Sequence, residues 1–466
     1  MAKKKNFAAK LASPFIGLGN FFKNIYKIFQ HGTIWTKLSF LILGISNLVH
    51  KQVLKGLLFL ATEILFILFM LSNGIDALIG LVTLGTKTQG WVFDEDLGID
   101  VLENGDNSML MLIYGIGTIL IIAIFIKILI ANIKSANKLQ KTLESGSPIL
   151  TLKHEASELL DRKFHITLLS LPVLGVLLFT ILPLIFMILI AFTNYDSAHQ
   201  PPGNLFDWVG VKNFFEMFSF SNKLGKTFTP VLVWTFTWAI LATASTYICG
   251  IILALMINKK GIKFKGLWRT IFVLTIAIPQ FISLLIMRNM FSKIGPINQA
   301  LSPLLGQQIP FLEDANIARI VILCINLWVG IPYTMLITSG ILMNIPKDIY
   351  ESAKIDGASS FVTFFKITLP YIMFVTAPYL ITQFIGNINN FNIIYLLIDG
   401  GPPTSDYYYA GKTDLLITWL YRLTVNQKDY NIASTIGICV FLISVVLSLM
   451  AYKRTSSYEK EGDFAC

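Results

Sequence analysis

The chain has 466 residues, of which 54% are hydrophobic and only 14% charged, and its formal net charge is +10. Soluble domains are about one quarter charged, so this chain lacks the polar surface that a water-facing protein needs. The basic residues lie between apolar runs and form no basic and aromatic surface module, which argues against nucleic acid as a partner and for a membrane protein.

Eight segments are long and apolar enough to cross a bilayer, which takes about 20 residues in a helix. In chain order they are residues 56–71, 109–130, 166–192, 231–257, 271–290, 317–342, 371–391 and 432–451. They predict an all-α polytopic membrane protein with about eight transmembrane helices.

Shorter segments accompany the first span. Apolar residues recur at helical spacing between Trp35 and Val49, which predicts an amphipathic helix lying in the membrane interface. The apolar residues 79–84 predict a re-entrant or surface segment. The acidic residues 91–106 predict a solvated loop, because the ligand spacing of a calcium loop is absent.

The positions of Lys and Arg predict the orientation of the spans. With the N-terminus in the cytoplasm, cytoplasmic segments hold 26 basic residues, external segments hold 8, and 3 lie within or at the ends of spans. This bias predicts that both termini are cytoplasmic. We divide the chain into an N-terminal extension with the interfacial helix, two spans and a linker (1–164), a six-span core (165–455) and a cytoplasmic tail (456–466).

The most specific motif lies in the loop after the sixth span, residues 346–370. Pro346 suits the first turn of a helix, Asp348 its positive end, and Gly357 a sharp turn. A second apolar face follows, with phenylalanines at positions 361, 364 and 365. Such faces on a cytoplasmic loop require either a protein partner or the membrane surface.

This loop resembles the EAA loop of ABC-importer permeases, in which Glu-Ala-Ala is followed by Gly and then by Ile-x-Leu-Pro. The matching positions are Glu351, Ala353, Gly357, Ile367, Leu369 and Pro370, while Ser352 departs from the motif. The resemblance implies a type I ABC-importer permease fold. It also implies that this loop, Asp356 included, is the coupling helix that docks in a groove of a cytoplasmic ATPase.

Other segments of the core are similar to the maltose/maltodextrin permease family. They are residues 278–283, 328–333, 387–391, 400–402 and 412–414. By this resemblance, the sugar site is lined by Ser283, Gly330, Tyr333, Asn387 and Asn390. Packing between helices is an equal alternative for each asparagine. Two departures are Gly386, where a larger aromatic residue can occur, and the short external loop 194–230, where some members carry a folded domain.

The resemblance implies several partners in the membrane of a bacterium. They are a second permease subunit in a heterodimer, two copies of a cytoplasmic ATPase, an extracellular solute-binding protein, an oligosaccharide and membrane lipid. The chain has no Gly-x-x-x-x-Gly-Lys-Ser/Thr run, so we expect it to bind no cofactor, with ATP hydrolysed by partner subunits. Its histidines and cysteines show no ligand spacing, and we expect neither a metal site nor an enzymatic activity.

Three alternatives remain open at this stage. The first is an ABC permease for a galacto-oligosaccharide or another oligosaccharide. The second is a secondary transporter, which needs intramembrane carboxylates for ion coupling, whereas only Glu63 stands out within the predicted spans. The third is a membrane-embedded enzyme, which needs a cluster of acidic residues or histidines near a membrane face.

Overall fold

The computed structural model describes residues 19–96, 98–149, 157, 160–162, 164–259 and 261–453. Its tertiary contacts divide the chain into two compact units. The first comprises Met1–Leu189 with His199–Asp207, and the second comprises Ile190–Ala198 with Trp208–Cys466. The predicted six-span core begins at residue 165, within the first of these units, and its membership stays a prediction.

The predicted number of spans is confirmed within the described residues. Seven helices are long and apolar enough to cross a membrane, and an eighth span results if one bent helix pair counts as a single span. Only 6% of the most apolar stretch of Val53–Thr83 is buried within the chain. Lipid or other subunits must therefore cover most of this helix, as expected for a span.

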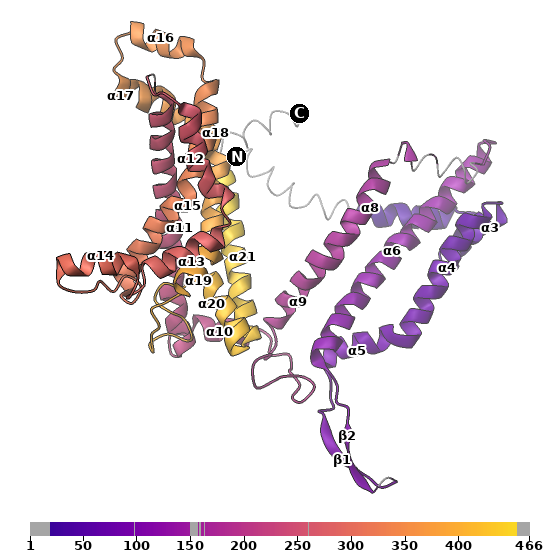
Figure 1. Ribbon diagram of the computed structural model, residues 1–466. Coiled ribbons are helices and arrows are strands. Elements are labelled where there is room, and N and C mark those ends of the chain that lie inside the picture. Colours follow the sequence, from indigo (N-terminus) through magenta and orange to yellow (C-terminus); the bar gives the residue numbers. More distant parts are fainter. Residues whose placement is uncertain are drawn as a thin grey trace. The chain divides into compact units, whose positions relative to one another are not determined.

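The first unit consists of helices and one hairpin (Figure 1). Residues 19–31 are helical, followed by α2 (Ile34–Leu38), α3 (Ile45–Val49), α4 (Val53–Phe69), the π-helical turn η1 (Met70–Gly74), α5 (Ile75–Thr83), β1 (Gly90–Asp94), β2 (Ile99–Glu103), α6 (Ser108–Glu144), α8 (Phe164–Val176), η2 (Leu177–Ile181) and α9 (Leu182–Ile190).

The prediction of one amphipathic helix over residues 35–49 is wrong, because α2 and α3 are separated by a turn. Gly44 adopts a left-handed conformation there, with φ of 79°. A Cβ on Gly44 would lie 2.1 Å from the carbonyl oxygen of Gly56, so the turn packs directly on α4. Helical periodicity alone does not reveal such a break.

Side chains of two spans, the buried Asn132 and the half-buried Glu63, satisfy the backbone of this turn. Asn132 of α6 accepts a hydrogen bond from the Gly44 amide (2.9 Å) and donates one to the Ser39 carbonyl (2.7 Å). Glu63 of α4 accepts one from the Leu43 amide (2.9 Å). Irregular backbone that is buried needs such internal partners, and Glu63 supplies one of them.

The apolar residues 79–84 do not form a separate segment, because α4 continues through η1 into α5. Figure 1 shows α5 turning away from the direction of α4. The acidic residues that follow form an antiparallel hairpin in place of the predicted loop, with Trp91 opposite Leu102 and Phe93 opposite Asp100. Every residue of β2 is exposed, so Asp100 and Glu103 face solvent as expected, whereas Asp94 and Asp106 are half-buried.

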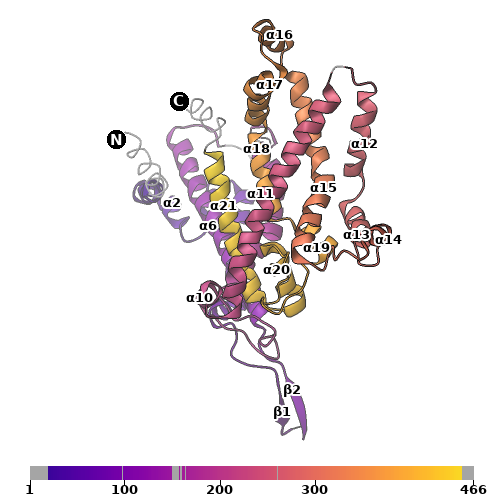
Figure 2. The ribbon, with the colours of Figure 1, turned by 90° about the vertical axis from the view of Figure 1, so that its left-hand side faces the viewer.

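The second unit contains the remaining helices. They are α10 (Lys212–Phe218), α11 (Lys223–Asn258), α12 (Lys265–Ala277), α13 (Gln280–Met290), α14 (Pro296–Leu305), α15 (Ala315–Asn344), α16 (Lys347–Ile355), α17 (Ser360–Thr363), η3 (Phe364–Thr368), α18 (Leu369–Ile388), α19 (Phe391–Ile398), α20 (Leu416–Arg422), η4 (Leu423–Gln427) and α21 (Tyr430–Tyr452). Figure 2 shows α11, α12 and α15 running together, with α13 and α14 turned across one end of α12.

The predicted span 271–290 is broken into α12 and α13, which are bent by 88°. Pro279 lies at the break, where it has no amide hydrogen to donate and forces Ile278 out of helical conformation (ψ 125°). The bend directs α13 toward α19, where Asn392 donates a hydrogen bond to Gln280 (3.2 Å).

Close packing holds α11 against α15. A Cβ on Gly250 of α11 would lie 2.5 Å from Cβ of Thr334, and one on Gly330 of α15 would lie 2.6 Å from Cγ2 of Thr246. Glycine and threonine thus alternate reciprocally across the helix pair, with four-residue spacing on both helices. Small residues of this kind let membrane helices approach closely, which lipid does not otherwise drive.

Candidate functional site

The coupling loop predicted over residues 346–370 is a short helix that ends in a glycine turn. The Gly357 amide donates to the Lys354 carbonyl (3.2 Å), and the Ala358 amide donates to the Ala353 carbonyl (2.9 Å). Gly357 has φ of 75° and Asp356 caps the helix, as in a Schellman motif. The motif glycine is therefore required for the elbow after α16.

The loop is anchored to the spans at its second half. The Tyr350 hydroxyl of α16 lies 3.1 Å from the Thr368 hydroxyl in η3. Phe364 and Leu369 pack against the buried cluster of Tyr247, Ile251, Ile341 and Ile372. Force applied to α16 would therefore reach α11, α15 and α18 through packed side chains.

The outer side of the loop is apolar and uncovered. Ile355 is 86% exposed, Phe361 71% and Phe365 48%, and the Phe361 and Phe365 rings lie 4.5 Å apart. Glu351 is also exposed, whereas Ala353 is buried. The predicted coupling residues thus divide into an exposed set that offers a docking face and a buried residue that holds α16 in place.

The remaining motif residues lie where the loop rejoins the spans. Ile367 is half-buried in η3, Leu369 begins α18, and Pro370 occupies the first turn of that helix. A proline is tolerated in a first helical turn because its missing amide hydrogen has no helical acceptor there.

The two predicted sugar-site asparagines meet where α18 gives way to α19. Asn387 is buried and donates to the Thr243 hydroxyl (2.9 Å), and Asn390 donates to the Asn387 side-chain oxygen (3.2 Å). Asn390 also caps α19 by accepting from the Ile393 amide (3.3 Å). Both side-chain amides thus join helices. Because several of their polar atoms are already hydrogen-bonded within the protein, fewer remain for a ligand than the sequence alone suggested.

The other three predicted sugar-site residues differ in their surroundings. Ser283 is half-buried on α13, Tyr333 on α15 is 44% exposed, and Gly330 packs against Thr246. Within the described residues, no hydrogen bond joins Ser283 or Tyr333 to the asparagine pair. Gly386 faces open space, because a Cβ there would meet no atom within 4 Å. Of these positions, Tyr333 and Gly386 are the most open to a ligand.

A polar stripe runs along α18 beneath the asparagines, and its pairing with side chains of neighbouring helices was missed by sequence reasoning. Gln383 donates to the Tyr379 hydroxyl (3.0 Å), which lies 3.0 Å from the Thr334 hydroxyl of α15. One turn further, Thr376 lies 2.6 Å from the Tyr247 hydroxyl of α11. The three- and four-residue spacing of these α18 positions was available in the sequence and places them on one face.

Three half-buried aromatic rings follow Asn390 and were also missed. Phe391 and Tyr395 of α19 stack at 4.8 Å, and Tyr421 of α20 meets them edge-on at 4.8 and 5.0 Å. Their meeting depends on the contact between α19 and α20, so no local sequence spacing predicts it. Aromatic rings beside amide groups are a composition typical of carbohydrate sites.

Comparison with known proteins agrees with this architecture. A family model described as "Binding-protein-dependent transport system inner membrane component" matches residues 246–454. The chain is 36% identical over 429 residues to the "Maltodextrin transport system permease protein MalC" of Streptococcus pneumoniae, covering 90% of this chain and 95% of that protein. It is 33% identical over 439 residues to the "Galactooligosaccharides transport system permease protein GanP" of Bacillus subtilis, covering 93% of this chain and 100% of that protein.

A solved structure also resembles it. Its title is "Crystal structure of a bacterial ABC transporter involved in the import of the acidic polysaccharide alginate", with 26% identity, a TM-score of 0.53, and coverage of 64% of this chain and 96% of that one. The chain belongs to the permease family of ABC importers. It is therefore a multi-pass membrane component of a transport system.

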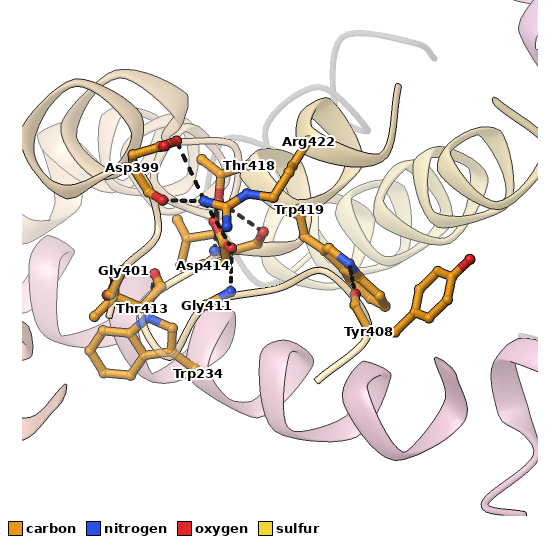
Figure 3. Close-up of polar contacts among 11 residues, drawn as sticks. Trp234, Asp399, Gly401, Tyr408, Gly411, Thr413, Asp414, Thr418, Trp419 and Arg422 are labelled. Carbon is orange, nitrogen blue, oxygen red and sulfur yellow. Dashed lines mark hydrogen bonds and ion pairs between the residues drawn. The ribbon is translucent and has the colours of Figure 1, made fainter. Parts of the chain in front are cut away.

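Two further segments of the permease that the sequence analysis singled out, residues 400–402 and 412–414, meet around a buried carboxylate (Figure 3). Asp414 accepts hydrogen bonds from the Gly411 amide (2.7 Å) and the Thr418 hydroxyl (2.8 Å). A Cβ on Gly400 would lie 1.8 Å from an Asp414 oxygen, so only glycine permits this approach. Thr413 donates to the Gly401 carbonyl (2.5 Å), which closes the two segments on each other.

Arg422 of α20 joins this buried carboxylate to the end of α19. Its guanidinium lies 3.6 Å from Asp414 and also donates to the Asp399 carbonyl. Burial raises the pKa of Asp414 to about 6, although Arg422 and the two hydrogen bonds oppose that shift. We name Asp399, Asp414 and Arg422 the carboxylate latch.

Proposed function

We propose that this permease forms half of the translocation pathway for a maltodextrin or a related oligosaccharide. The observation that carries the proposal is the anchored coupling loop with its exposed apolar face at Ile355, Phe361 and Phe365. Such a face needs a protein partner, and a short rigid helix transmits force better than a mobile loop. The near full-length likeness to a maltodextrin permease supports the cargo.

The proposed complex contains a second permease subunit, two copies of a cytoplasmic ATPase and an extracellular solute-binding protein. In the proposed cycle, the binding protein delivers sugar to the outer mouth, and ATP closes the ATPase subunits. Their closure pulls on the Glu351–Pro370 loop and rotates the spans. The excess of basic residues in alternate loops supports cytoplasmic termini, which place this loop on the ATPase side.

Sugar recognition is assigned to Ser283, Gly330, Tyr333, Asn387 and Asn390. The exposed Tyr333 ring offers a face on which a sugar ring can stack. The side-chain amides of Asn387 and Asn390 offer hydrogen-bond partners for sugar hydroxyl groups. Gly330 contributes by keeping α11 and α15 close, since any larger residue would strike Thr246. The open space at Gly386 supports a site wide enough for an oligosaccharide chain.

The decisive experiment reconstitutes the permease with its partner subunits and ATPase in proteoliposomes. We expect ATP hydrolysis to rise when the binding protein is loaded with maltodextrin. A second candidate cargo is a galacto-oligosaccharide, which the likeness to GanP favours. Competition between the two sugars for uptake separates these candidates, and a complex in which no oligosaccharide stimulates hydrolysis refutes sugar import altogether.

A further inference from the structure

The first unit contains a cavity of about 700 Å³ between the end of the first span and α6. Phe69, Leu110 and Ile121 contribute to its apolar walls, and Asn73, Asp76 and Asp106 contribute polar groups. The volume lies within the range of ligand sites, about 300–1,000 Å³. An apolar wall with a cluster of polar groups suits an amphiphile.

Asp76 is the group in this cavity that calls for a partner. It is an exposed residue near the end of the long apolar helix Val53–Thr83, and its carboxylate makes no hydrogen bond or ion pair among the described residues. Glu63, the other carboxylate of that helix, accepts a hydrogen bond from the Leu43 amide. Ionisable groups in membrane helices are costly, and they face a cavity or a partner.

The depth of Asp76 fits the headgroup level of a lipid. It follows Val53 by 23 positions, and about 20 helical residues cross the hydrocarbon core. The π-helical turn η1 separates α4 from α5 just before Asp76. Such turns occur often at functional sites.

The charge of the cavity restricts the headgroup. Asp106 accepts hydrogen bonds from the Thr86 amide (2.7 Å) and the Lys87 amide (3.0 Å), which lowers the pKa of its carboxyl and keeps it ionised. Two carboxylates and no Lys or Arg line the cavity among the residues that the structure describes, and the Lys87 side chain, which acts on Asp106, lies outside that lining. An unbalanced anionic headgroup would be repelled there.

We propose that this cavity binds a membrane lipid whose headgroup donates hydrogen bonds to Asp76 and carries no net negative charge. The acyl chain lies along Phe69, Leu110 and Ile121. Ammonium and hydroxyl groups share the required donor chemistry, so an ethanolamine lipid and a glycosyl-diacylglycerol both qualify. The N-terminal extension thereby acquires a role in anchoring the permease to lipid, separate from transport.

The test measures lipid retention by the purified full complex with native mass spectrometry. The complex is equilibrated with phosphatidylethanolamine, phosphatidylcholine, phosphatidylglycerol or diglucosyl-diacylglycerol. Phosphatidylcholine matches the charge of the ethanolamine lipid but has no N–H donor. We expect retention of the ethanolamine and glucosyl lipids over the other two by about tenfold, the range of a hydrogen bond to a charged group.

Two variants test whether Asp76 causes this lipid preference. Asp76→Leu should abolish the preference, whereas Asp100→Leu, on the exposed strand β2 outside the cavity, should leave it unchanged. Equal retention of ethanolamine and choline lipids would overturn the proposal, as would an unchanged preference in Asp76→Leu. A preference for phosphatidylglycerol would contradict the charge argument. Because sugar-stimulated ATP hydrolysis is not measured, the result is independent of the proposed cargo.

Discussion

The Arg422 guanidinium lies 3.6 Å from the Asp414 carboxylate, whose side chain is only 1% exposed. Arg422 also donates to the carbonyl of Asp399, the residue that ends α19. One side chain thus ties the end of α19, the 400–414 segment and α20 together. Because α19 also contacts α13 through Asn392 and Gln280, the carboxylate latch supports the helices that carry the predicted sugar residues.

The first prediction concerns removal of Arg422, the cation of the carboxylate latch. Arg422→Met removes the counter-charge of the buried Asp414, and protonation of this carboxyl, whose pKa is already about 6, limits the resulting loss of unfolding free energy at pH 7.5 to about 2 kcal/mol. We expect a lower midpoint of thermal unfolding in detergent. The double variant Arg422→Met/Asp414→Asn should recover much of this loss, since no charge is then buried. Lys293→Met, at an exposed position, is the control and should change the midpoint little.

The second prediction concerns pH. The pKa of Asp414 is about 6 in the folded chain and 3.8 ordinarily, so folding favours its protonated form. The resulting stabilisation is fully present below about pH 4 and is lost as pH rises through about 6. Two pKa units correspond to about 3 kcal/mol. Between pH 7.5 and 5.5 we expect the unfolding midpoint to rise.

Asp414→Asn supplies the comparison for that pH experiment, because its side chain cannot titrate. Its unfolding midpoint should lack the part of the pH dependence that Asp414 contributes. Identical pH profiles for the two proteins would show that another group is responsible.

Local rules predicted the sharp turn at Gly357, which follows from backbone chemistry that is readable in the sequence. The break at Pro279 divides a segment that was predicted as one span, although the proline that causes it is visible in the sequence. The turn at Gly44 was missed, because it depends on Asn132, which lies 88 positions further along the chain. The Asp414–Arg422 pair was missed for a similar reason: the motif that contains Asp414 was noticed, but its partner is set by how the 400–414 segment closes on α20.

The third prediction tests the elbow of the coupling loop. Gly357 has a positive φ, while a Cβ there would meet no atom within 4 Å, so backbone strain and not space limits substitution. Asparagine tolerates this conformation better than alanine, and a β-branched residue tolerates it least. Co-purification of the ATPase should therefore decrease in the order Gly, Asn, Ala, Val. Equal co-purification across the series would argue against a fixed elbow.

Gly357→Trp adds surface bulk to the backbone strain in the same assay. Its bulk would fill the space beside the exposed face of the loop, and we expect it to block ATPase association while the spans still insert. Normal assembly and transport in this variant would refute the docking role of the loop.

The fourth prediction concerns the broken segment α2–α3. Asn132→Ala removes both hydrogen bonds to its turn and leaves the Gly44 amide and the Ser39 carbonyl buried without partners. Each unsatisfied group costs about 1–3 kcal/mol, so the turn should open locally. A cysteine at position 43, where the Leu43 side chain is 1% exposed, should then react faster with a membrane-impermeant thiol reagent. Lys138→Ala, at an exposed position of α6, is the control and should leave that rate unchanged.

The fifth prediction tests the width of the proposed sugar site. Gly386 faces open space next to Asn387, so Gly386→Phe can place a ring there without displacing protein atoms. A ring adds a stacking surface of about 0.5–1.5 kcal/mol and also narrows the site. We expect the concentration for half-maximal uptake to fall a few fold for a disaccharide and to rise for a long oligosaccharide. Gly340→Phe introduces the same ring at a different open glycine, on α15 and not on α18. It should leave the ratio of the two half-maximal concentrations, disaccharide to long oligosaccharide, unchanged. If both variants shift the ratio alike, the pathway does not pass Gly386.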